Sequence, residues 1–218
     1  MSDQALRADA HANDVDQPRL NRRQAAKVRT RQKVLDAARS LFAERGYEPA
    51  TIRDIAKVAG MSTGAVFANF QDKAELFEAV LTEDMDRLAD DLKAGAGTGS
   101  VSDRLAASLA AGYHGSLDHL PLMQAIVARS WFQPEAAETR ARVVTGRLTG
   151  VISQILRDGV AAGELSQDAD VPLLTDLVWD AYLSNYRRAA YDGWNGQQLS
   201  NHVGKQIAVI LAGALTRK

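Results

Sequence analysis

The sequence contains no cysteine, and none of its apolar segments approaches the roughly 18 residues that a membrane-spanning helix needs. The first absence excludes a disulfide framework, a zinc site with cysteine ligands and a cysteine nucleophile. The second predicts that the chain does not cross a membrane. The first 16 residues contain four aspartates, whereas a secretory signal has a basic start followed by an apolar stretch, so we expect a cytoplasmic protein.

Motifs that indicate catalysis are also missing. The sequence has no phosphate-binding loop, nucleophile elbow or helix with paired carboxylates, and the glycine-rich segment 95–99 lacks both a following lysine and a preceding strand. His114 and His119 lie five residues apart, which is a poor spacing for two metal ligands on one helical face, and Gly115 is expected to break the helix between them. We therefore expect no catalytic residues, no metal and no cofactor.

Charge is unevenly distributed along the chain, although the net charge is only −1. Residues 19–73 contain 12 Lys or Arg against 5 Asp or Glu, a balance of +7, and the segments on both sides are acidic. A basic end on an acidic protein is typical of a chain that meets nucleic-acid phosphates at that end. A hydrophobic content of 46% is enough to form the core of one large domain or two modest ones.

The most informative stretch, residues 51–73, predicts two short helices joined by a tight turn. Thr51 is expected to cap the first helix, with Asp54 at capping-box spacing, and Gly60 to end it. Ser62 is expected to cap the second helix. Small or apolar residues form one face of the first helix, at Ile52, Ile55, Ala56 and Ala59.

In the second helix, Val66 and Phe70 lie four residues apart and are expected to point into the core. The remaining side chains are small or lightly polar, which allows close approach to a DNA groove. These are Thr63, Gly64, Phe67, Ala68 and Asn69. The pattern therefore predicts a DNA-binding helix-turn-helix.

Over roughly residues 29–81 the sequence resembles the tetracycline-repressor (TetR) family of transcriptional regulators, whose motif is approximately T-x-R-D-I-A-x-x-A-G-x-S-x-G-x-x-Y-x-x-F-x-x-K-x-x-L. The matching positions are Thr51, Arg53, Asp54, Ile55, Ala56, Ala59, Gly60, Ser62, Gly64, Phe70, Lys73 and Leu76. One position departs from the motif: Phe67 stands where the family usually has a tyrosine that donates a hydrogen bond to a DNA phosphate.

The resemblance implies an all-α protein, with an N-terminal three-helix helix-turn-helix domain followed by a helical bundle for ligand binding and dimerisation. It implies a homodimeric regulator, a repressor released from a palindromic operator in double-stranded DNA by a small-molecule effector. The expected DNA-binding residues are Thr51, Arg53, Ser62, Thr63, Gly64, Phe67, Ala68, Asn69 and Lys73.

Composition and periodicity divide the chain into five segments. We expect an N-terminal arm at 1–24, a DNA-binding domain at 25–71, a connector helix at 72–93, a linker at 94–100 and a second domain at 101–218. The arm could place Arg22 and Arg23 in a minor groove or be a passive tail, and the tail is favoured slightly. Further helices are expected at 25–45, 101–118, 120–132, 134–158, 170–191 and 197–216.

The last two predicted helices carry apolar stripes that suit either a dimer interface or packing within the chain. The family resemblance favours the dimer, and Ile207 and Leu211 are the positions where an inserted charge is expected to disrupt it.

The second domain also contains the candidate effector-binding residues. A single aromatic or methionine residue at helical spacing more often belongs to the hydrophobic core, but together these residues could line a cavity for a mostly apolar ligand. They are Tyr113, His114, Met123, Val127, Trp131, Phe132, Trp179, Tyr182 and Tyr186. Two alternative functions remain open: an all-helical enzyme or adaptor of the same fold that does not bind DNA, and a protein that coats DNA without sequence preference.

Overall fold

A computed structural model describes residues 22–130 and 135–216, in which the chain is helical and forms no strand. The expected all-α fold is confirmed. In chain order, the helices are α1 (Arg22–Arg45), α2 (Ile52–Val58), α3 (Thr63–Phe67), α4 (Lys73–Gly95), α5 (Val101–Ser116), the short 3₁₀ helix η1 (Leu117–His119), α6 (Leu120–Ser130), α7 (Glu135–Ala161), α8 (Val171–Asp192) and α9 (Gly196–Leu211).

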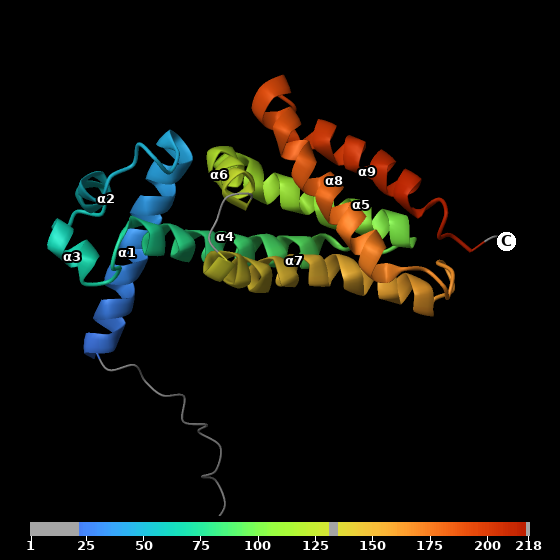
Figure 1. Ribbon diagram of the computed structural model, residues 1–218, viewed down its shortest axis with the longest axis horizontal. Coiled ribbons are helices and arrows are strands. Elements are labelled where there is room, and N and C mark those ends of the chain that lie inside the picture. The colour runs from blue at the N-terminus through green and yellow to red at the C-terminus, as the bar shows by residue number, and fades with distance from the viewer. Residues whose placement is uncertain (1–21, 131–134, 217–218) are drawn as a thin grey trace, which may run out of the picture.

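The head consists of α1, α2, α3 and the first turns of α4, at one end of the molecule (Figure 1). The predicted caps are present: the Thr51 hydroxyl accepts a hydrogen bond from the Asp54 amide at 3.2 Å, and the Ser62 hydroxyl accepts one from the Ala65 amide at 3.2 Å. Gly60 adopts a φ of 68°, which a residue with a side chain rarely does. Local chemistry therefore fixes the turn between α2 and α3.

Helix α4 connects the head to the rest of the molecule, which we call the body (Figure 1). Its N-terminal half contributes Leu76, Phe77 and Val80 to the head core, and its C-terminal half contributes Met85, Leu88 and Leu92 to the body core. One continuous helix therefore belongs to both cores and connects the head with the body.

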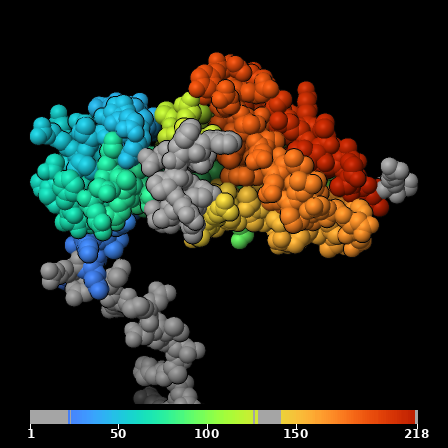
Figure 2. All heavy atoms as spheres, viewed as in Figure 1, coloured from blue at the N-terminus to red at the C-terminus, as the bar shows by residue number. Residues whose placement is uncertain are grey.

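The body packs α5, α7, α8 and α9 around the C-terminal half of α4, and Figure 2 shows it as the larger lobe. Helix α5 lies against α4 and α9, whereas α7 lies against α4 and α8. Helix α6 reaches back to α1, and its Leu122 is buried in the head core. The head and body are thus joined by α6 as well as by α4.

Three expectations about helix ends were wrong. Helix α5 continues through Gly115, where the missing side chain leaves room for a carboxylate: an added Cβ would lie 2.2 Å from Asp91 Oδ2. Helix α9 ends at Leu211 and not at 216, because residues 212–216 turn back and the Thr216 amide donates a hydrogen bond to the Glu164 carbonyl oxygen at 3.0 Å. The last three residues of the expected arm, 22–24, are helical, and residues 1–21 lie outside the described part.

Candidate DNA interface and ligand cavities

Helix α3 presents an exposed face of small side chains and one ring. Val66 is fully buried and anchors the helix on the head core. Thr63, Gly64 and Ala68 are exposed, and 53% of the Phe67 surface is accessible. Four of the residues expected at DNA bases or sugars therefore do face solvent together, with little side-chain bulk to prevent close approach.

Asn69, which was expected near bases, is partly buried and folded back on its own helix. Its Nδ2 donates a hydrogen bond to the Ala65 carbonyl oxygen at 2.9 Å, and its Oδ1 is buried without a partner among the described residues. The Asn69 carbonyl oxygen accepts a hydrogen bond from Arg31 Nη1 at 3.1 Å. A base contact by Asn69 stays a prediction and requires its side chain to rotate.

Lys73, which was expected on a phosphate, bonds within the head. Its Nζ donates to the carbonyl oxygens of Tyr47 at 3.0 Å and Glu48 at 3.2 Å, and it lies 4.2 Å from the centroid of the Tyr47 ring. The ammonium group keeps one N–H for a phosphate, so that contact stays a prediction. This structural role could not be predicted from local sequence, because the partners are main-chain oxygens 25 and 26 residues away.

Other basic side chains of the head are exposed and unpaired. Arg53 and Lys57 on α2 form no hydrogen bond or ion pair with another described residue, nor do Lys27, Arg29 and Lys33 on α1. Unpaired cations on the head are suited to neutralising phosphates. The Thr51 hydroxyl donates a hydrogen bond to Asp54 at 2.7 Å and lowers the pKa of that carboxyl, so the acidic member of the cap remains charged.

A partly buried ion network joins the head to the connector helix. Arg39 on α1 donates from Nε to Asp84 Oδ1 at 2.8 Å and from Nη1 to Asp36 at 2.8 Å, and it also pairs with Glu83. The side chains of Arg39 and Asp84 are each only 10% exposed. Arg87 pairs with the same Asp84 oxygen. Breaking such a pair leaves a charge without a partner, which typically costs about 3–5 kcal/mol.

The predicted ligand-binding tyrosines form a closed hydrogen-bonded cluster. The Tyr113 hydroxyl donates to the Tyr182 carbonyl oxygen at 3.0 Å, the hydroxyls of Tyr182 and Tyr186 lie 2.7 Å apart, and Ser116 Oγ lies 2.5 Å from the Tyr186 hydroxyl. Burial raises the pKa of Tyr186 to about 12. The three rings are buried in the core of the body. Their contact with a ligand therefore stays a prediction and requires this cluster to rearrange.

The other predicted ligand-binding residues are scattered. His114 is exposed, with Nδ1 2.8 Å from the Ala110 carbonyl oxygen, and Trp179 is half-buried against the Tyr182 ring. Val127 is half-buried on α6. Trp131 and Phe132 lie outside the described residues. Met123 lines a cavity between the helices.

That cavity has a volume of about 230 Å³ and lies where α4, α5, η1 and α6 meet. Two of its lining residues each have a buried polar atom with no partner among the described residues: Asp84 Oδ2 and His119 Nδ1. Burial is the main cause that lowers the pKa of His119, and the Arg87 and Arg39 guanidinium groups add to it. The lining residues are Asp84, Met85, Arg87, Leu88, Asp91, Gly115, Ser116, His119, Leu122 and Met123.

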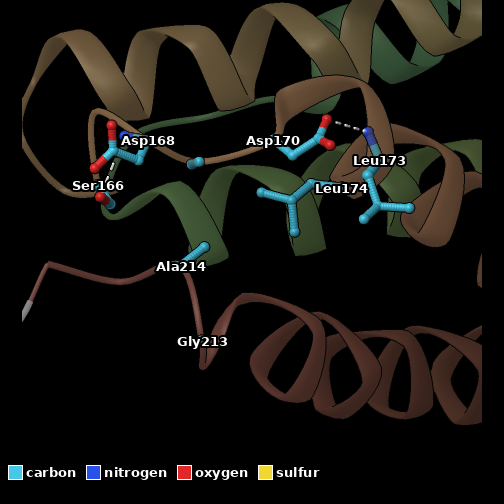
Figure 3. Close-up of a pocket in the computed structure, with 8 residues that line it drawn as sticks. Ser166, Asp168, Asp170, Leu173, Leu174, Gly213 and Ala214 are labelled. Carbon is cyan, nitrogen blue, oxygen red and sulfur yellow. Dashed lines mark hydrogen bonds between the residues drawn. The ribbon is translucent and has the colours of Figure 1, made fainter.

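A second cavity of about 290 Å³ lies at the far end of the body, between the α7–α8 turn and the end of α9 (Figure 3). Its polar groups serve the local turn: Asp170 Oδ1 accepts from the Leu173 amide at 3.0 Å, and Ser166 Oγ accepts from the Asp168 amide at 3.3 Å. The remaining lining residues are Ala169, Leu174, Gly213 and Ala214. This cavity offers a ligand few free polar atoms.

Helices α8 and α9 leave an apolar surface uncovered. Leu173 and Leu177 on α8 are exposed, as is Val209 on α9, with 77% of its surface accessible. Ile207 and Leu211, in contrast, are buried in the body core, where α9 packs on α5. Of the two roles that the sequence left open, these two residues have the intrachain one, so a charge at either position would disrupt the fold of the subunit itself.

In the described ranges 22–130 and 135–216, no group of three or more acidic or histidine side chains could hold a metal ion. No helix in those ranges is long and apolar enough to cross a membrane.

Several matches to known proteins cover the head of the molecule. Residues 34–80 match the model of the family described as bacterial regulatory proteins, tetR family. Over 63 residues the chain is 48% identical to the transcriptional repressor AcnR of Corynebacterium efficiens, a match that covers 29% of this chain and 34% of that protein. The chain thus spans only about a third of the length of the first curated relatives that it matches.

Longer matches extend into the body. The chain is 26% identical over 152 residues to the transcriptional regulator UidR of Escherichia coli K12, covering 69% of this chain and 76% of UidR. A TetR/AcrR-family regulator from Thermobifida fusca has the same fold, with a TM-score of 0.65 at 24% identity over 81% of this chain and 95% of its own. FadR from Bacillus subtilis, solved in complex with stearoyl-CoA, superposes with a TM-score of 0.72 at 18% identity over 81% of this chain and 96% of its own.

The helix-turn-helix match, the repressor relatives and the shared fold agree with one another. Residues 34–80 therefore form the helix-turn-helix segment of the family of bacterial regulatory proteins described as tetR, and the chain as a whole resembles regulators of that family in fold.

Proposed function

We propose that the protein is a sequence-specific DNA-binding repressor that places α3 in a major groove. The observation that carries this proposal is the exposed face of α3, which is held on a rigid head core and accompanied by unpaired cations on α1 and α2. The relatives that match this head are transcriptional repressors. A helix with small side chains can approach base edges closely, and the surrounding cations bind phosphates without regard to sequence.

Thr63, Gly64 and Ala68 would lie near bases, with Thr51, Ser62 and Arg53 at the adjacent backbone. Phe67 would contact a thymine methyl group or a sugar, since an exposed ring without a hydroxyl can make only apolar contacts there. Because these side chains are short, most of the affinity would come from phosphates and most of the specificity from the close fit of α3.

We further propose a homodimer formed through α8 and α9. The uncovered residues Leu173, Leu177 and Val209 support it, because exposed apolar side chains on neighbouring helices suit a second subunit. A two-fold dimer would place two copies of α3 on half-sites about 34–36 Å apart, or a multiple of that, which requires a palindromic operator. Such a protein would act in the cytoplasm, where bacterial DNA lies.

A small-molecule effector would release the repressor by moving α4. The structure of FadR with stearoyl-CoA shows that one protein of this fold holds a small molecule. In this chain α4 contributes to both cores, so a ligand that shifts it in the body would change the separation of the two heads. A coupling of about 1–3 kcal/mol would lower operator affinity roughly 5- to 150-fold.

The experiment is a selection of bound duplexes from genomic fragments, followed by titrations at several salt concentrations. A repressor of this kind selects related two-fold symmetric sequences and loses affinity steeply with added salt. A protein that coats DNA binds every duplex equally, and an enzyme or adaptor of this fold binds none.

A further inference from the structure

The cavity between α4, α5, η1 and α6 is lined by two residues that each have a buried polar atom without a partner in the described part of the chain. The neighbouring tyrosine cluster satisfies its own hydroxyls, whereas Asp84 Oδ2 and His119 Nδ1 are buried with no partner among the described residues. A buried acceptor without a partner is destabilising unless something binds it. Asp84 lines the cavity and its side chain is nine-tenths buried, and a turn of its carboxylate toward the cavity would bring the unpartnered Oδ2 to a ligand.

The charges of the cavity favour a cation. Asp84 and Asp91 both line it, and Asp91 forms no hydrogen bond or ion pair with any described residue. Arg87 is the one lysine or arginine among its described lining residues, and its guanidinium already pairs with Asp84 and extends to solvent. His119 adds little positive charge to repel a cation, because burial and the nearby guanidinium groups lower its pKa and favour the neutral ring.

The shape and the apolar lining favour an organic cation over a metal ion. Met85, Leu88, Leu122 and Met123 provide the rest of the wall, and no group of three or more possible metal ligands occurs in the described part of the chain. A volume of about 230 Å³ is below the roughly 300–1,000 Å³ of ordinary ligand pockets, so the ligand is compact.

We propose that this cavity is the effector site and that it binds a small organic cation, an ammonium ion with a compact apolar group. The ammonium N–H groups donate to Asp84 Oδ2 and to the Asp91 carboxylate, while the apolar group contacts the methionine and leucine side chains. This inference rests on the proposed function, because it identifies the class of effector for the repressor.

The site also offers a route to the DNA-binding head. Asp84 accepts from Arg39, which pairs in turn with Asp36 on α1. A ligand cation on Asp84, which already pairs with Arg39 and Arg87, competes with Arg39 for the carboxylate and weakens the attachment of α1 to α4. Occupancy is therefore expected to lower operator affinity, and operator DNA must lower ligand affinity by the same factor.

The test uses isothermal titration calorimetry of the full chain with three nearly isosteric probes: phenethylammonium, phenylethanol and phenylacetate. Smaller and larger primary alkylammonium ions are also titrated, so that the size of the ammonium ligand is varied. We expect ammonium ions of the right size to bind and the alcohol and the carboxylate not to. Equal binding of all three probes, or no binding by any ammonium ion of the series at millimolar concentration, would overturn the proposal.

Asp91→Asn is the decisive variant, since it removes a charge that forms no hydrogen bond or ion pair with a described residue. We expect it to weaken ammonium binding about tenfold, whereas Asp90→Asn, on the exposed face one residue earlier, leaves binding unchanged. Gly115→Ala is a second variant: alanine favours a helix more than glycine does, yet its Cβ displaces the Asp91 carboxylate and should also weaken binding. Equal affinities in Asp91→Asn and Asp90→Asn would refute the assignment.

Operator titrations with and without the bound ammonium ion then test the coupling. Unchanged operator affinity at saturating ligand would show that the cavity is not the effector site. If the protein bound no DNA at all, the proposed function would fail, whereas the calorimetric result on the cavity would stand by itself.

Discussion

At the scale of single residues, several side chains serve the fold in positions where a DNA contact was expected. Lys73 binds two main-chain carbonyl oxygens, and Asn69 is folded back onto α3. The exposed face of α3 therefore depends mainly on Thr63, Gly64 and Phe67. Substitutions at these residues separate effects on DNA binding from effects on stability.

Phe67→Tyr is expected to tighten binding to every duplex about 2- to 10-fold, because the added hydroxyl gains one hydrogen bond to a phosphate, worth roughly 0.5–1.5 kcal/mol. Stability should not change, since the ring is 53% exposed. Fluorescence anisotropy on a panel of duplexes measures the affinity and thermal unfolding the stability. An unchanged affinity would mean that the ring edge does not lie at the backbone.

Lys73→Met is expected to lower the free energy of unfolding by about 1–3 kcal/mol, because the carbonyl oxygens of Tyr47 and Glu48 lose a charged donor. Lys57→Met is the control, since Lys57 is exposed and has no such partner. Urea denaturation of both variants measures the difference. Equal stabilities would show that the Lys73 contacts contribute nothing to folding.

His119 is expected to make stability depend on pH. The pKa of His119 in the folded protein lies below the usual 6.5. As pH falls through about 6.5, the unfolded chain therefore binds more protons than the folded chain, and the free energy of unfolding decreases. The pKa of His202 is also lowered, so His202 contributes to the same dependence of stability on pH. His119→Gln should make the decline between pH 7.5 and 5.5 shallower than in the wild type, as measured by urea denaturation at each pH. Parallel curves would contradict the burial of His119.

At the scale of helices, local sequence predicted what local chemistry determines. The caps at Thr51 and Ser62 and the turn at Gly60 follow from residues within four positions of one another, and all three are present. The network around Arg39 could not be predicted, because its partners Glu83 and Asp84 are 44 and 45 residues away. The cavity that it borders was missed for the same reason, and of the nine predicted ligand-binding residues only Met123 lines it.

The attachment of α1 to α4 is expected to depend on Arg39. Arg39→Met leaves the buried Asp84 carboxylate without its main partner and should destabilise the protein by about 3–5 kcal/mol. Arg45→Met, which removes an exposed pair with the adjacent Glu44, should change stability by less than about 1 kcal/mol. Thermal unfolding of both variants measures this contrast. Similar losses would show that the network is not a structural connection.

At the scale of the whole molecule, α8 and α9 belong to the body, which α4 connects with the head (Figure 1). These two helices carry the exposed apolar side chains Leu173, Leu177 and Val209. Val209→Asp should give a folded monomer, because Val209 is exposed and packs on nothing in its own subunit core. Ile207→Asp should unfold the body, since only 1% of the Ile207 surface is accessible. Light scattering reports the mass and circular dichroism the fold. A Val209→Asp variant that remains dimeric would place the interface elsewhere.

Sequence-specific DNA binding is the central claim, and one titration tests it most directly. Wild-type protein and Val209→Asp are titrated against a palindrome selected from genomic fragments and against a scrambled duplex of the same length. We expect the wild type to prefer the palindrome by about 10³-fold or more at physiological salt, and the monomeric variant to lose most of that preference. Equal affinity of the wild type for the two duplexes would contradict the account.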